Sequence, residues 1–336
     1  MEKKGCEVLI TASKKDVTFE LLDHYGFQYV NIGSYGESIP QKAINLPLLD
    51  IRMYHRIKRS AFNPDIFLGL GSIRASHVAY FMKKPSIIFE DTEHSREQHL
   101  LYLPFASVIL TPSCFRKNLG GKHIRYDSYH ELAYLHPKYF KPDRAILDEM
   151  KLSDADKYIV VRFVSWKATH DIGQRGIRER VRFVTELEKY GQVLITSESK
   201  LENELEKYRI KVAPEKIHDL LYYAAMYVGE GAKMATEAAI LGTPSIYISS
   251  LASTMGNFIE LQQKYGLVFI YNDPDKALER AVKLLQEQNL KDKWRAKRQK
   301  LLKDKIDVTE FMVWFVENYP LSAEESKLIK SGKIRK

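Results

Sequence analysis

Two carboxylates and a histidine stand close together directly after one apolar run of the sequence. Asp91, Glu93 and His94 follow residues 86–89, which are typical of a buried strand. Ligands of open α/β sheets bind beyond the carboxyl ends of the strands. A carboxylate, or a histidine that a carboxylate orients, can take a proton from a hydroxyl near neutral pH. We therefore predict acid–base chemistry here. Surface charge around a capped helix is the alternative, and we expect no metal site because adjacent ligands on one loop rarely complete a coordination sphere.

A glycine-rich turn is the second candidate for chemistry. Gly229 and Gly231 flank Glu230, after a short apolar run and before a helix that starts near Ala232. Backbone N–H groups beside the positive end of a helix can receive an anion such as a diphosphate. Glu237, about one and a half turns further along, can bind sugar or ribose hydroxyls. An ordinary βα turn is the alternative, because a short glycine-rich turn is a weak motif.

A third polar stretch also follows an apolar run and opens a helix. Ser72, Arg74 and His77 come after residues 66–68 and two glycines. Ser72 and the start of the helix can contact an anion, while Arg74 or His77 can bind a phosphate or an acceptor molecule. A helix that is simply capped by Ser72 explains the same pattern, so both interpretations stay open.

The elements that position these residues alternate along nearly the whole chain. Apolar runs of strand length separated by helical patterns are typical of βα units that build a parallel sheet. In the first half the predicted strands are 7–11, 29–32, 66–68, 86–89, 107–110 and 123–125, and the predicted helices are 16–25, 41–59, 72–81 and 112–120.

The second half restarts the same alternation with a buried strand at 157–165. Further predicted strands are 192–196, 226–228, 245–248 and 267–270, between helices at 177–190, 201–208, 214–225, 232–242, 254–265, 274–288, 290–303 and 308–317. Two such halves predict an α/β protein with two Rossmann-like domains that face each other across a cleft. The expected boundaries are 1–140, a linker at 141–156, 157–305, and a final segment at 306–336.

Composition limits the possible functions. The 336 residues are 45% hydrophobic and 28% charged, which fits a globular chain of two domains. Apolar runs are too short to span a bilayer and the start has no signal-peptide core, so we expect a cytoplasmic protein. The net charge of +9 is concentrated in the last third. It indicates solvated helix faces, or contact with a membrane surface or a phosphate-bearing substrate. No nucleic-acid-binding module accompanies it, so we expect no nucleic-acid partner.

The beginning of the sequence is unusual for a doubly wound domain. Residues 1–5 are typical of the last turn of a helix and its glycine stop, directly before the strand at 7–11. Because such a domain normally begins with a strand, the pattern favours a first domain that lacks its first βα unit. Either the chain is truncated or it truly lacks that element.

Three stretches of the chain resemble a known family of prokaryotic proteins, DUF354. They are residues 8–27 (VLITASKKDVTFELLDHYGF), 89–94 (FEDTEH) and 229–244 (GEGAKMATEAAILGTP). That family is similar to the GT-B superfamily, which holds nucleotide-sugar glycosyltransferases and UDP-N-acetylglucosamine 2-epimerases. The likeness to DUF354 covers nearly the whole chain, whereas the likeness to GT-B enzymes rests on 229–231, Glu237 and 241–244.

The resemblance implies roles for residues of the second domain. The turn at 229–231 and the helix start at Ala232 would contact the donor diphosphate, and Glu237 would hold the ribose. Glu230 stands where a small residue is usual, and a carboxylate beside a diphosphate is repulsive. Arg162, Lys167 or His170, near the first strand of this domain, would supply compensating positive charge. The resemblance also implies one more strand and helix at the start, and a last helix that crosses back to the first, acceptor-side domain.

We therefore predict a metal-independent, cofactor-free glycosyltransferase that uses a UDP-type nucleotide-sugar, in the synthesis of surface polysaccharides or glycoconjugates. The basic surface suits an acceptor that is anionic or associated with a membrane. Two alternatives stay open: a UDP-sugar 2-epimerase, and a non-catalytic nucleotide-sugar-binding protein.

Overall fold

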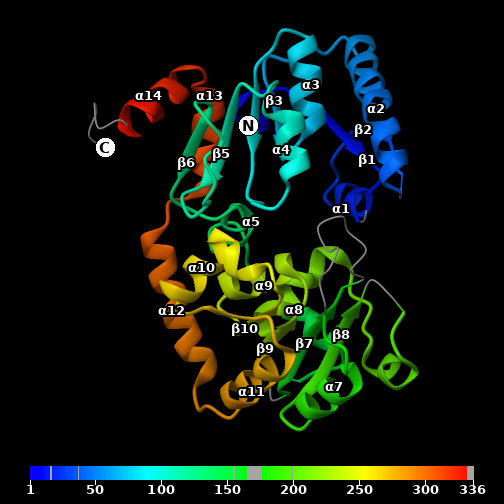
Figure 1. Cartoon of the computed structure of the whole chain (residues 1–336), viewed down its shortest axis with the longest axis vertical. Coiled ribbons are helices and arrows are strands. Elements are labelled where there is room, and N and C mark those ends of the chain that lie inside the picture. Colours follow the sequence, from blue (N-terminus) through cyan, green and yellow to red (C-terminus); the bar gives the residue numbers. More distant parts are fainter. Residues whose placement is uncertain (16, 37, 154–155, 165–175, 198–199, 331–336) are drawn as a thin grey trace. The chain divides into compact units, whose positions relative to one another are not determined.

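The chain divides into two compact units (Figure 1). The computed structural model describes residues 1–15, 17–36, 38–153, 156–164, 176–197 and 200–330. Unit 1 comprises Met1–Ser113, Lys117–Tyr126 and Thr309–Lys336, and unit 2 comprises Cys114–Arg116 and Asp127–Val308. The stretch expected to be a linker therefore belongs to unit 2, whereas helix α13 (Val308–Glu317) belongs almost entirely to unit 1.

Unit 2 is built on a parallel sheet in the order β11-β10-β9-β7-β8. Its strands are β7 (Tyr158–Phe163), β8 (Gln192–Ser197), β9 (Met226–Gly229), β10 (Ser245–Ile248) and β11 (Val268–Tyr271). A parallel bridge between Ile195 and Arg209 adds one more pairing beyond β8. Counted with this bridge, the strand order is that of a Rossmann fold, in which the order reverses between the first and fourth strands, here β7 and β9.

Helices connect the strands of unit 2 and cover its sheet. They are α5 (Leu132–Leu135), α6 (Ala145–Glu149), α7 (Arg180–Glu188), α8 (Ile217–Tyr223), α9 (Ala232–Leu241), α10 (Gly256–Gln263), α11 (Pro274–Leu285) and α12 (Leu290–Asp304), with the 3-10 turns η3 (Asn203–Tyr208), η4 (Pro214–Lys216) and η5 (Ala252–Thr254). Every residue of β9 and β10 is buried, as expected for parallel strands covered on both faces.

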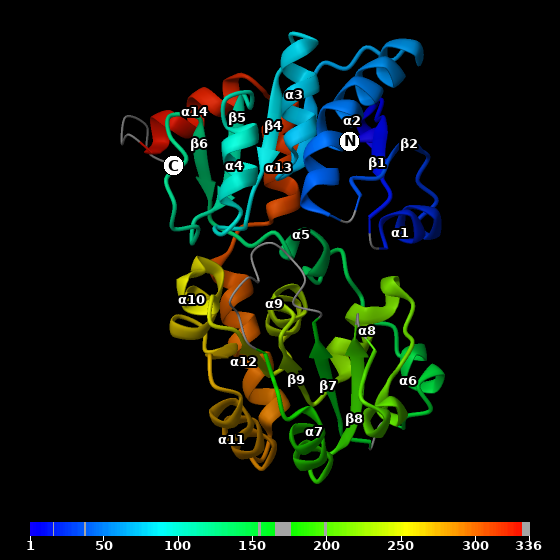
Figure 2. The ribbon, with the colours of Figure 1, turned by 45° about the vertical axis from the view of Figure 1, so that its right-hand side comes forward.

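Unit 1 contains two separate parallel sheets. One pairs β1 (Ile10–Ser13) with β2 (Tyr29–Gly33), and the other has the order β3 (Phe67–Leu70), β4 (Ser86–Phe89), β5 (Val108–Pro112), β6 (His123–Tyr126). Its helices are α1 (Thr18–His24), α2 (Ile39–Arg59), α3 (Ile73–Phe81), α4 (Arg96–Tyr102), α13 and α14 (Leu321–Lys330), with the 3-10 turn η1 (Glu2–Lys4). Figure 2 shows β1 and β2 beside α2, at the end of the unit away from β6.

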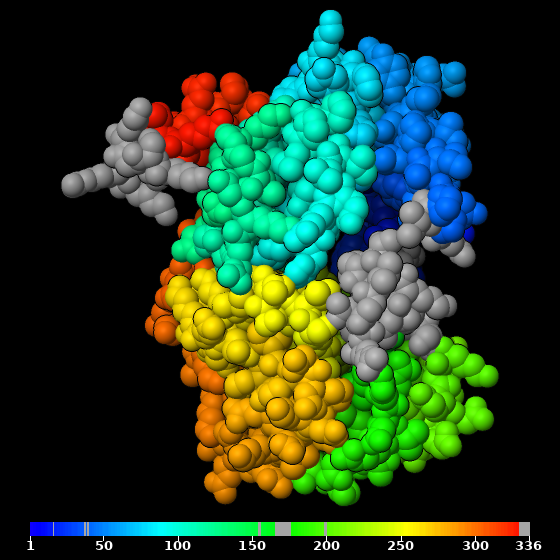
Figure 3. All heavy atoms as spheres, in the orientation of Figure 1, coloured from blue at the N-terminus to red at the C-terminus, as the bar shows by residue number. Residues whose placement is uncertain are grey.

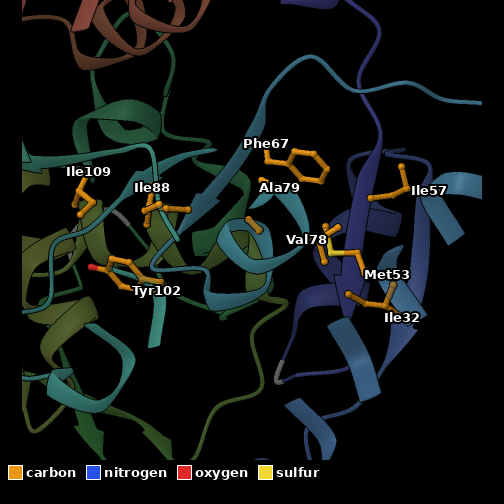
Figure 4. Close-up of a cluster of buried hydrophobic side chains, with 11 residues drawn as sticks. Ile32, Met53, Ile57, Phe67, Val78, Ala79, Ile88, Tyr102 and Ile109 are labelled. Carbon is orange, nitrogen blue, oxygen red and sulfur yellow. The ribbon is translucent and has the colours of Figure 1, made fainter. Parts of the chain in front are cut away.

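The two sheets of unit 1 share one apolar core (Figure 4). Ile32 of β2, Met53 of α2, Val78 of α3 and Ile88 of β4 belong to the same buried cluster. In the space-filling view, the segment that holds α3 and α4 (cyan) lies in the middle of the visible face of this unit, between blue and green segments (Figure 3). The core therefore holds β1 and β2 in the unit through α2 and α3, since no pairing of β1 or β2 with β3 is present among the described residues.

Two sequence expectations for unit 1 differ from the structure. The helix predicted at 112–120 is wrong: this stretch is a turn and an irregular loop. Ser113 N–H donates to the carbonyl of Tyr126, and Arg125 donates to the carbonyl of Lys117, at 2.7 Å in both cases. These contacts bind the loop to β6 in place of helical hydrogen bonds. The second difference is α14, because no helix was predicted beyond residue 317.

Candidate functional site

The glycine turn of unit 2 lies where the strand order of the sheet reverses. Gly229 ends β9 and is in register with Arg162 of β7, and Glu230 N–H donates to the Arg162 carbonyl at 3.0 Å. A Cβ on Gly229 would lie 2.5 Å from that carbonyl oxygen, so only glycine fits here. Binding sites of open α/β sheets form at this reversal, and the structure places the predicted diphosphate turn there.

Glu230 has a different environment from the one its sequence position suggested. The residue is buried, and its carboxylate accepts backbone N–H bonds from Val164 at 3.0 Å and Ile177 at 2.6 Å. Hydrogen bonds from two N–H groups stabilise the charge. Glu230 therefore ties together the backbone on either side of residues 165–175, and the repulsion expected between it and a diphosphate is reduced.

The first turn of α9 follows without a side-chain cap. Gly231 precedes the helix and offers no side-chain hydrogen bond, and its carbonyl accepts from the Tyr227 phenol at 2.9 Å. Gly231 and Ala232 are partly exposed. The N–H groups of a first helical turn have no acceptor within the helix, so this end of α9 suits an anion. Lys233, in the same turn, pairs with Glu131 at 2.9 Å.

Glu237 is held by side chains from two other helices. Its Oε1 accepts from the Tyr134 phenol at 2.9 Å and lies 3.2 Å from His218 Nε2. The carboxyl is only 6% exposed, so these partners offset the cost of burying its charge. Tyr134 belongs to α5 and His218 to α8. A buried, oriented carboxylate at this place can accept hydrogen bonds from ligand hydroxyls.

Of the three residues predicted to supply positive charge to this site, the structure describes one. Arg162 is described: its Cβ and Cγ pack against the backbone of the glycine turn, with Cγ 3.0 Å from the position of a Cβ on Gly231. Lys167 and His170 lie outside the described residues. Their proposed contact with a leaving diphosphate stays a prediction.

In unit 1 the acidic cluster after β4 is organised by Glu90, which was not among the predicted catalytic residues. Its Oε1 accepts from the N–H groups of Asp91 and Thr92 at 3.0 and 2.8 Å, and its Oε2 accepts from the Tyr102 phenol at 2.9 Å. His99 Nε2 lies 3.4 Å from the same Oε2. Burial alone would raise the pKa of Glu90, but hydrogen bonds from His99, the Thr92 backbone and Tyr102 hold the pKa below its usual value. Glu90 is therefore a charged carboxylate whose hydrogen bonds hold the loop after β4 in place.

The three predicted catalytic residues follow Glu90 in the same loop. Asp91 accepts a 3.0 Å hydrogen bond from the Thr92 hydroxyl, Glu93 is buried, and His94 is partly exposed. This loop lies close to the polar stretch that begins at Ser72, because a Cβ on the preceding Gly71 would lie 3.2 Å from Glu90 Oε2. Ser72, Arg74 and Asp91–His94 thus follow neighbouring strands of one sheet edge.

Among Ser72, Arg74 and His77, Arg74 is the residue whose surroundings suit the binding of an anion. The residue is 4% exposed, and its guanidinium donates to Ser13 Oγ at 2.7 Å and stacks on Tyr35 with Cζ 4.5 Å from the ring centre. No described carboxylate forms an ion pair with Arg74, and its Nε is buried without a hydrogen-bond acceptor. A buried cation of this kind favours an anionic ligand.

Ser72 and His77 have structural partners. Ser72 Oγ caps α3 by accepting from Ala75 N–H at 3.1 Å. Both ring nitrogens of His77 are engaged, with Asp50 Oδ2 at 2.8 Å and the Leu101 carbonyl at 2.9 Å. The hydrogen bond with Asp50 raises the pKa of His77 against the opposing effect of burial. These contacts favour a packing role over the predicted acceptor contact.

Sequence reasoning missed the partners of Glu237. His218 is separated from Glu237 by a whole βα connection, and no local pattern links the two positions. Tyr134 lies in a stretch rich in tyrosine, histidine and glutamate, at residues 129–134, and no sequence pattern links it to Glu237 either. Within the described parts of the chain, no group of three or more potential metal ligands gathers. No helix there is both long and apolar enough to cross a membrane.

Solved structures of other proteins share the fold of this chain. The chain is similar to the UDP-GlcNAc 2-epimerase of Methanocaldococcus jannaschii, with 14% identity, 88% of this chain and 92% of that chain covered, and a TM-score of 0.59. It is also similar to the spinosyn forosaminyltransferase SpnP, with 12% identity, 96% and 93% coverage, and a TM-score of 0.59. At such identities the likeness concerns the fold: two Rossmann-like units of the GT-B type, as the sequence predicted.

The family is shown by the sequence itself. A family model described as "Protein of unknown function (DUF354)" matches residues 1–320, and the chain belongs to this family. An uncharacterized protein of Methanocaldococcus jannaschii, MJ0665, is 27% identical over 258 residues, which are 73% of this chain and 74% of that protein. The resemblance inferred from three short stretches is thereby confirmed.

Proposed function

We propose that unit 2 binds the nucleoside diphosphate part of a UDP-type sugar donor, and that the protein transfers the sugar to an acceptor hydroxyl. The observation that carries this proposal is the pairing, on one helix, of an uncapped first turn with the buried Glu237. The helix start suits the diphosphate. The carboxylate suits ribose hydroxyls, which donate hydrogen bonds.

Three further observations support this assignment. The site lies where the strand order reverses, between β7 and β9. The carboxylate of Glu230 accepts hydrogen bonds from backbone N–H groups, which reduces its repulsion of an anion at the turn. Several solved proteins of similar fold hold UDP or thymidine diphosphate.

Transfer requires a base for the acceptor. In the proposed reaction the base removes the proton of the acceptor hydroxyl, whose oxygen then attacks the anomeric carbon of the sugar. The bond from that carbon to the diphosphate oxygen breaks, and UDP leaves. Glu93 or His94 is the proposed base, with Asp91 beside them, and positive groups near the diphosphate take the place of a metal ion. Arg74 makes an anionic acceptor, such as one carrying a phosphate at a membrane surface, the preferred class.

Isothermal titration with UDP tests the binding step. The wild-type protein should bind UDP at one site per chain, and Glu237→Gln should weaken binding about tenfold, as expected when hydrogen bonds to a charged group are lost. Glu204→Gln, at an exposed carboxylate of unit 2, is the matched control and should bind like the wild type. Equal affinity of all three proteins for UDP would show that Glu237 does not contribute to UDP binding.

A UDP-sugar 2-epimerase is the second candidate, favoured by the fold shared with the Methanocaldococcus jannaschii enzyme. Epimerisation removes and returns the proton at C2, so a reaction in D2O would place deuterium at that carbon. Retention of the C2 proton during turnover would exclude this activity. Binding of UDP-sugars without turnover, over a panel of phosphate-bearing acceptors, would instead support a non-catalytic binding protein.

A further inference from the structure

Helix α2 of unit 1 is apolar on two opposite faces. Its inner face contributes Met53 and Ile57 to the buried core. On its outer face Ile44, Leu48 and Ile51 follow one another at helical spacing and are 65%, 52% and 56% exposed. A surface helix of a globular protein normally has polar and charged residues on its outer face. The outer stripe of α2, as we call these three residues, is therefore unusual for a face that contacts only water.

The charged side chains around this stripe are positive. The exposed lysines and arginines of α2 are Lys42, Arg52, Arg56, Lys58 and Arg59. The acidic residue of the helix, Asp50, is buried and lies 2.8 Å from His77 on the inner side. In the described part of the chain no carboxylate forms an ion pair with any of the five cations. The outer side of α2 thus combines apolar and positive side chains, without negative charge from the helix itself.

The basic run in the last third of the chain has a different character. In α12 the leucines and the tryptophan are buried or half-buried, among them Trp294 and Leu301. Lys293 of this helix pairs with Glu287 at 2.7 Å. The outer face of α12 therefore offers charge without an apolar stripe, which is typical of a solvated helix face.

We propose that the outer stripe of α2 docks on the surface of a membrane that contains anionic lipids. A helix of this kind lies in the plane of the membrane, with its apolar side chains at the boundary between headgroups and acyl chains. Lysine and arginine beside that boundary are attracted to anionic headgroups. The outer stripe meets the first requirement, and the five cations meet the second. Figure 1 shows α2 along the outer side of unit 1, next to α3.

A second copy of the chain fits the outer stripe less well. In a twofold contact the same patch meets itself, so Arg52, Arg56 and Arg59, which lie beside the stripe on the helix, would approach their own copies. Like charges that face each other across an interface are unfavourable. The surface of an anionic bilayer, in contrast, supplies opposite charge and an apolar phase together.

Cosedimentation of the full chain with lipid vesicles tests the proposal. The wild type should bind vesicles of equimolar phosphatidylglycerol and phosphatidylcholine, and should bind vesicles of phosphatidylcholine alone about tenfold more weakly or less. Added salt should weaken the binding to the anionic vesicles, because it screens exposed charges. No binding to the anionic vesicles would overturn the proposal.

The apolar contribution is tested by Ile44→Gln combined with Leu48→Gln and Ile51→Gln. This triple variant should partition onto the anionic vesicles more than about tenfold less than the wild type, because three side chains no longer leave water. Its urea midpoint should equal that of the wild type, since the three side chains are exposed in the folded protein. Wild-type partitioning of this variant would overturn the proposal.

A matched control exists for the single substitution Leu48→Gln. Leu100 of α4 is 73% exposed, so Leu100→Gln makes the same chemical change on another helix of unit 1. Leu48→Gln should weaken vesicle binding, whereas Leu100→Gln should leave it unchanged. Equal losses in the two variants would mean that exposed leucines act without regard to their place, against a specific role of α2.

The electrostatic contribution is tested by Arg56→Gln combined with Lys58→Gln and Arg59→Gln. Binding to the anionic vesicles should fall by about fivefold for each charge removed, as expected for basic residues close to a lipid surface. An equal loss of binding to phosphatidylcholine vesicles would contradict recognition of anionic headgroups.

Helix α12 provides the control for net charge. Arg295→Gln combined with Lys300→Gln and Lys303→Gln removes three exposed positive charges and should have a small effect. An equal or larger loss in this variant would assign the contact to α12 and overturn the proposal. So would a wild-type dimer that the triple variant of the outer stripe dissociates, because a second copy would then occupy the stripe. Vesicle binding by unit 1 and UDP binding by unit 2 are separate measurements, so either can fail alone.

Discussion

The phenol of Tyr134 donates a 2.9 Å hydrogen bond to the carboxylate of Glu237. The bond joins α5 to α9, and His218, 3.2 Å from the same oxygen, adds α8. A carboxylate held in this way has its orientation fixed before a ligand arrives, which lowers the entropic cost of binding.

Removal of the Tyr134 hydroxyl should weaken nucleotide binding. In Tyr134→Phe, Glu237 loses a donor that orients it, and the affinity for UDP should fall by about tenfold, the effect of one charge-assisted hydrogen bond. Titration calorimetry measures this. Tyr139→Phe is the control, because Tyr139 also binds a carboxylate of unit 2, Asp307, at 2.7 Å, away from α9. An unchanged affinity in Tyr134→Phe would mean that Glu237 does not need this donor.

Gly229→Ala should destabilise unit 2. The added Cβ would lie 2.5 Å from the Arg162 carbonyl oxygen, which is backbone and cannot move aside. We expect a loss of about 2 kcal/mol in the free energy of unfolding, typical of overpacking, measured by urea denaturation. Gly121→Ala, where a Cβ meets nothing within 4 Å, should be nearly neutral. Similar stabilities of the two variants would contradict the close approach of β7 and the turn.

The pair of His77 and Asp50 should make the stability of unit 1 depend on pH. The hydrogen bond with Asp50 raises the pKa of His77 above its ordinary value of 6.5. The stabilisation is therefore complete below that value and is lost as pH rises through the raised pKa. Urea midpoints should fall between pH of about 6 and about 9 in the wild type, and fall less in Asp50→Asn. His55→Gln, at an exposed histidine of the same helix as Asp50, should keep the wild-type profile. A flat wild-type profile would refute the raised pKa.

Glu93→Gln should slow turnover without affecting the donor. Loss of a general base typically costs about a hundredfold or more in kcat, while UDP affinity, which depends on unit 2, should stay the same. His94→Gln separates the two candidate bases, and Glu97→Gln, at an exposed carboxylate of α4, is the control. If neither Glu93→Gln nor His94→Gln reduces kcat, the base lies elsewhere.

The sequence predicted the fold well because its signals are local. The strands at 86–89 and 245–248 and the helix at 308–317 have the predicted bounds, since each is an apolar run or an apolar stripe between clear breakers. The helix predicted at 112–120 failed because contacts with β6, distant in sequence, decide that stretch.

The site was predictable only in part, for the same reason. The turn at 229–231 and Glu237 follow from glycine spacing and helical periodicity. The role of Glu230 depends on Val164 and Ile177, which lie more than fifty residues before it, and His218 has no sequence pattern that connects it to Glu237. Residue type alone does not distinguish a candidate ligand-binding carboxylate such as Glu237 from a structural carboxylate such as Glu90. Burial and hydrogen bonds with other helices and strands distinguish them.

Amide chemical-shift changes on addition of UDP test whether the start of α9 binds the nucleotide. We expect saturable shifts centred on Gly231, Ala232 and the residues around Glu237, and much weaker binding with the same centre in Glu237→Gln. No saturable change at these amides, or shifts centred on another part of unit 2, would contradict a nucleotide site at the start of α9.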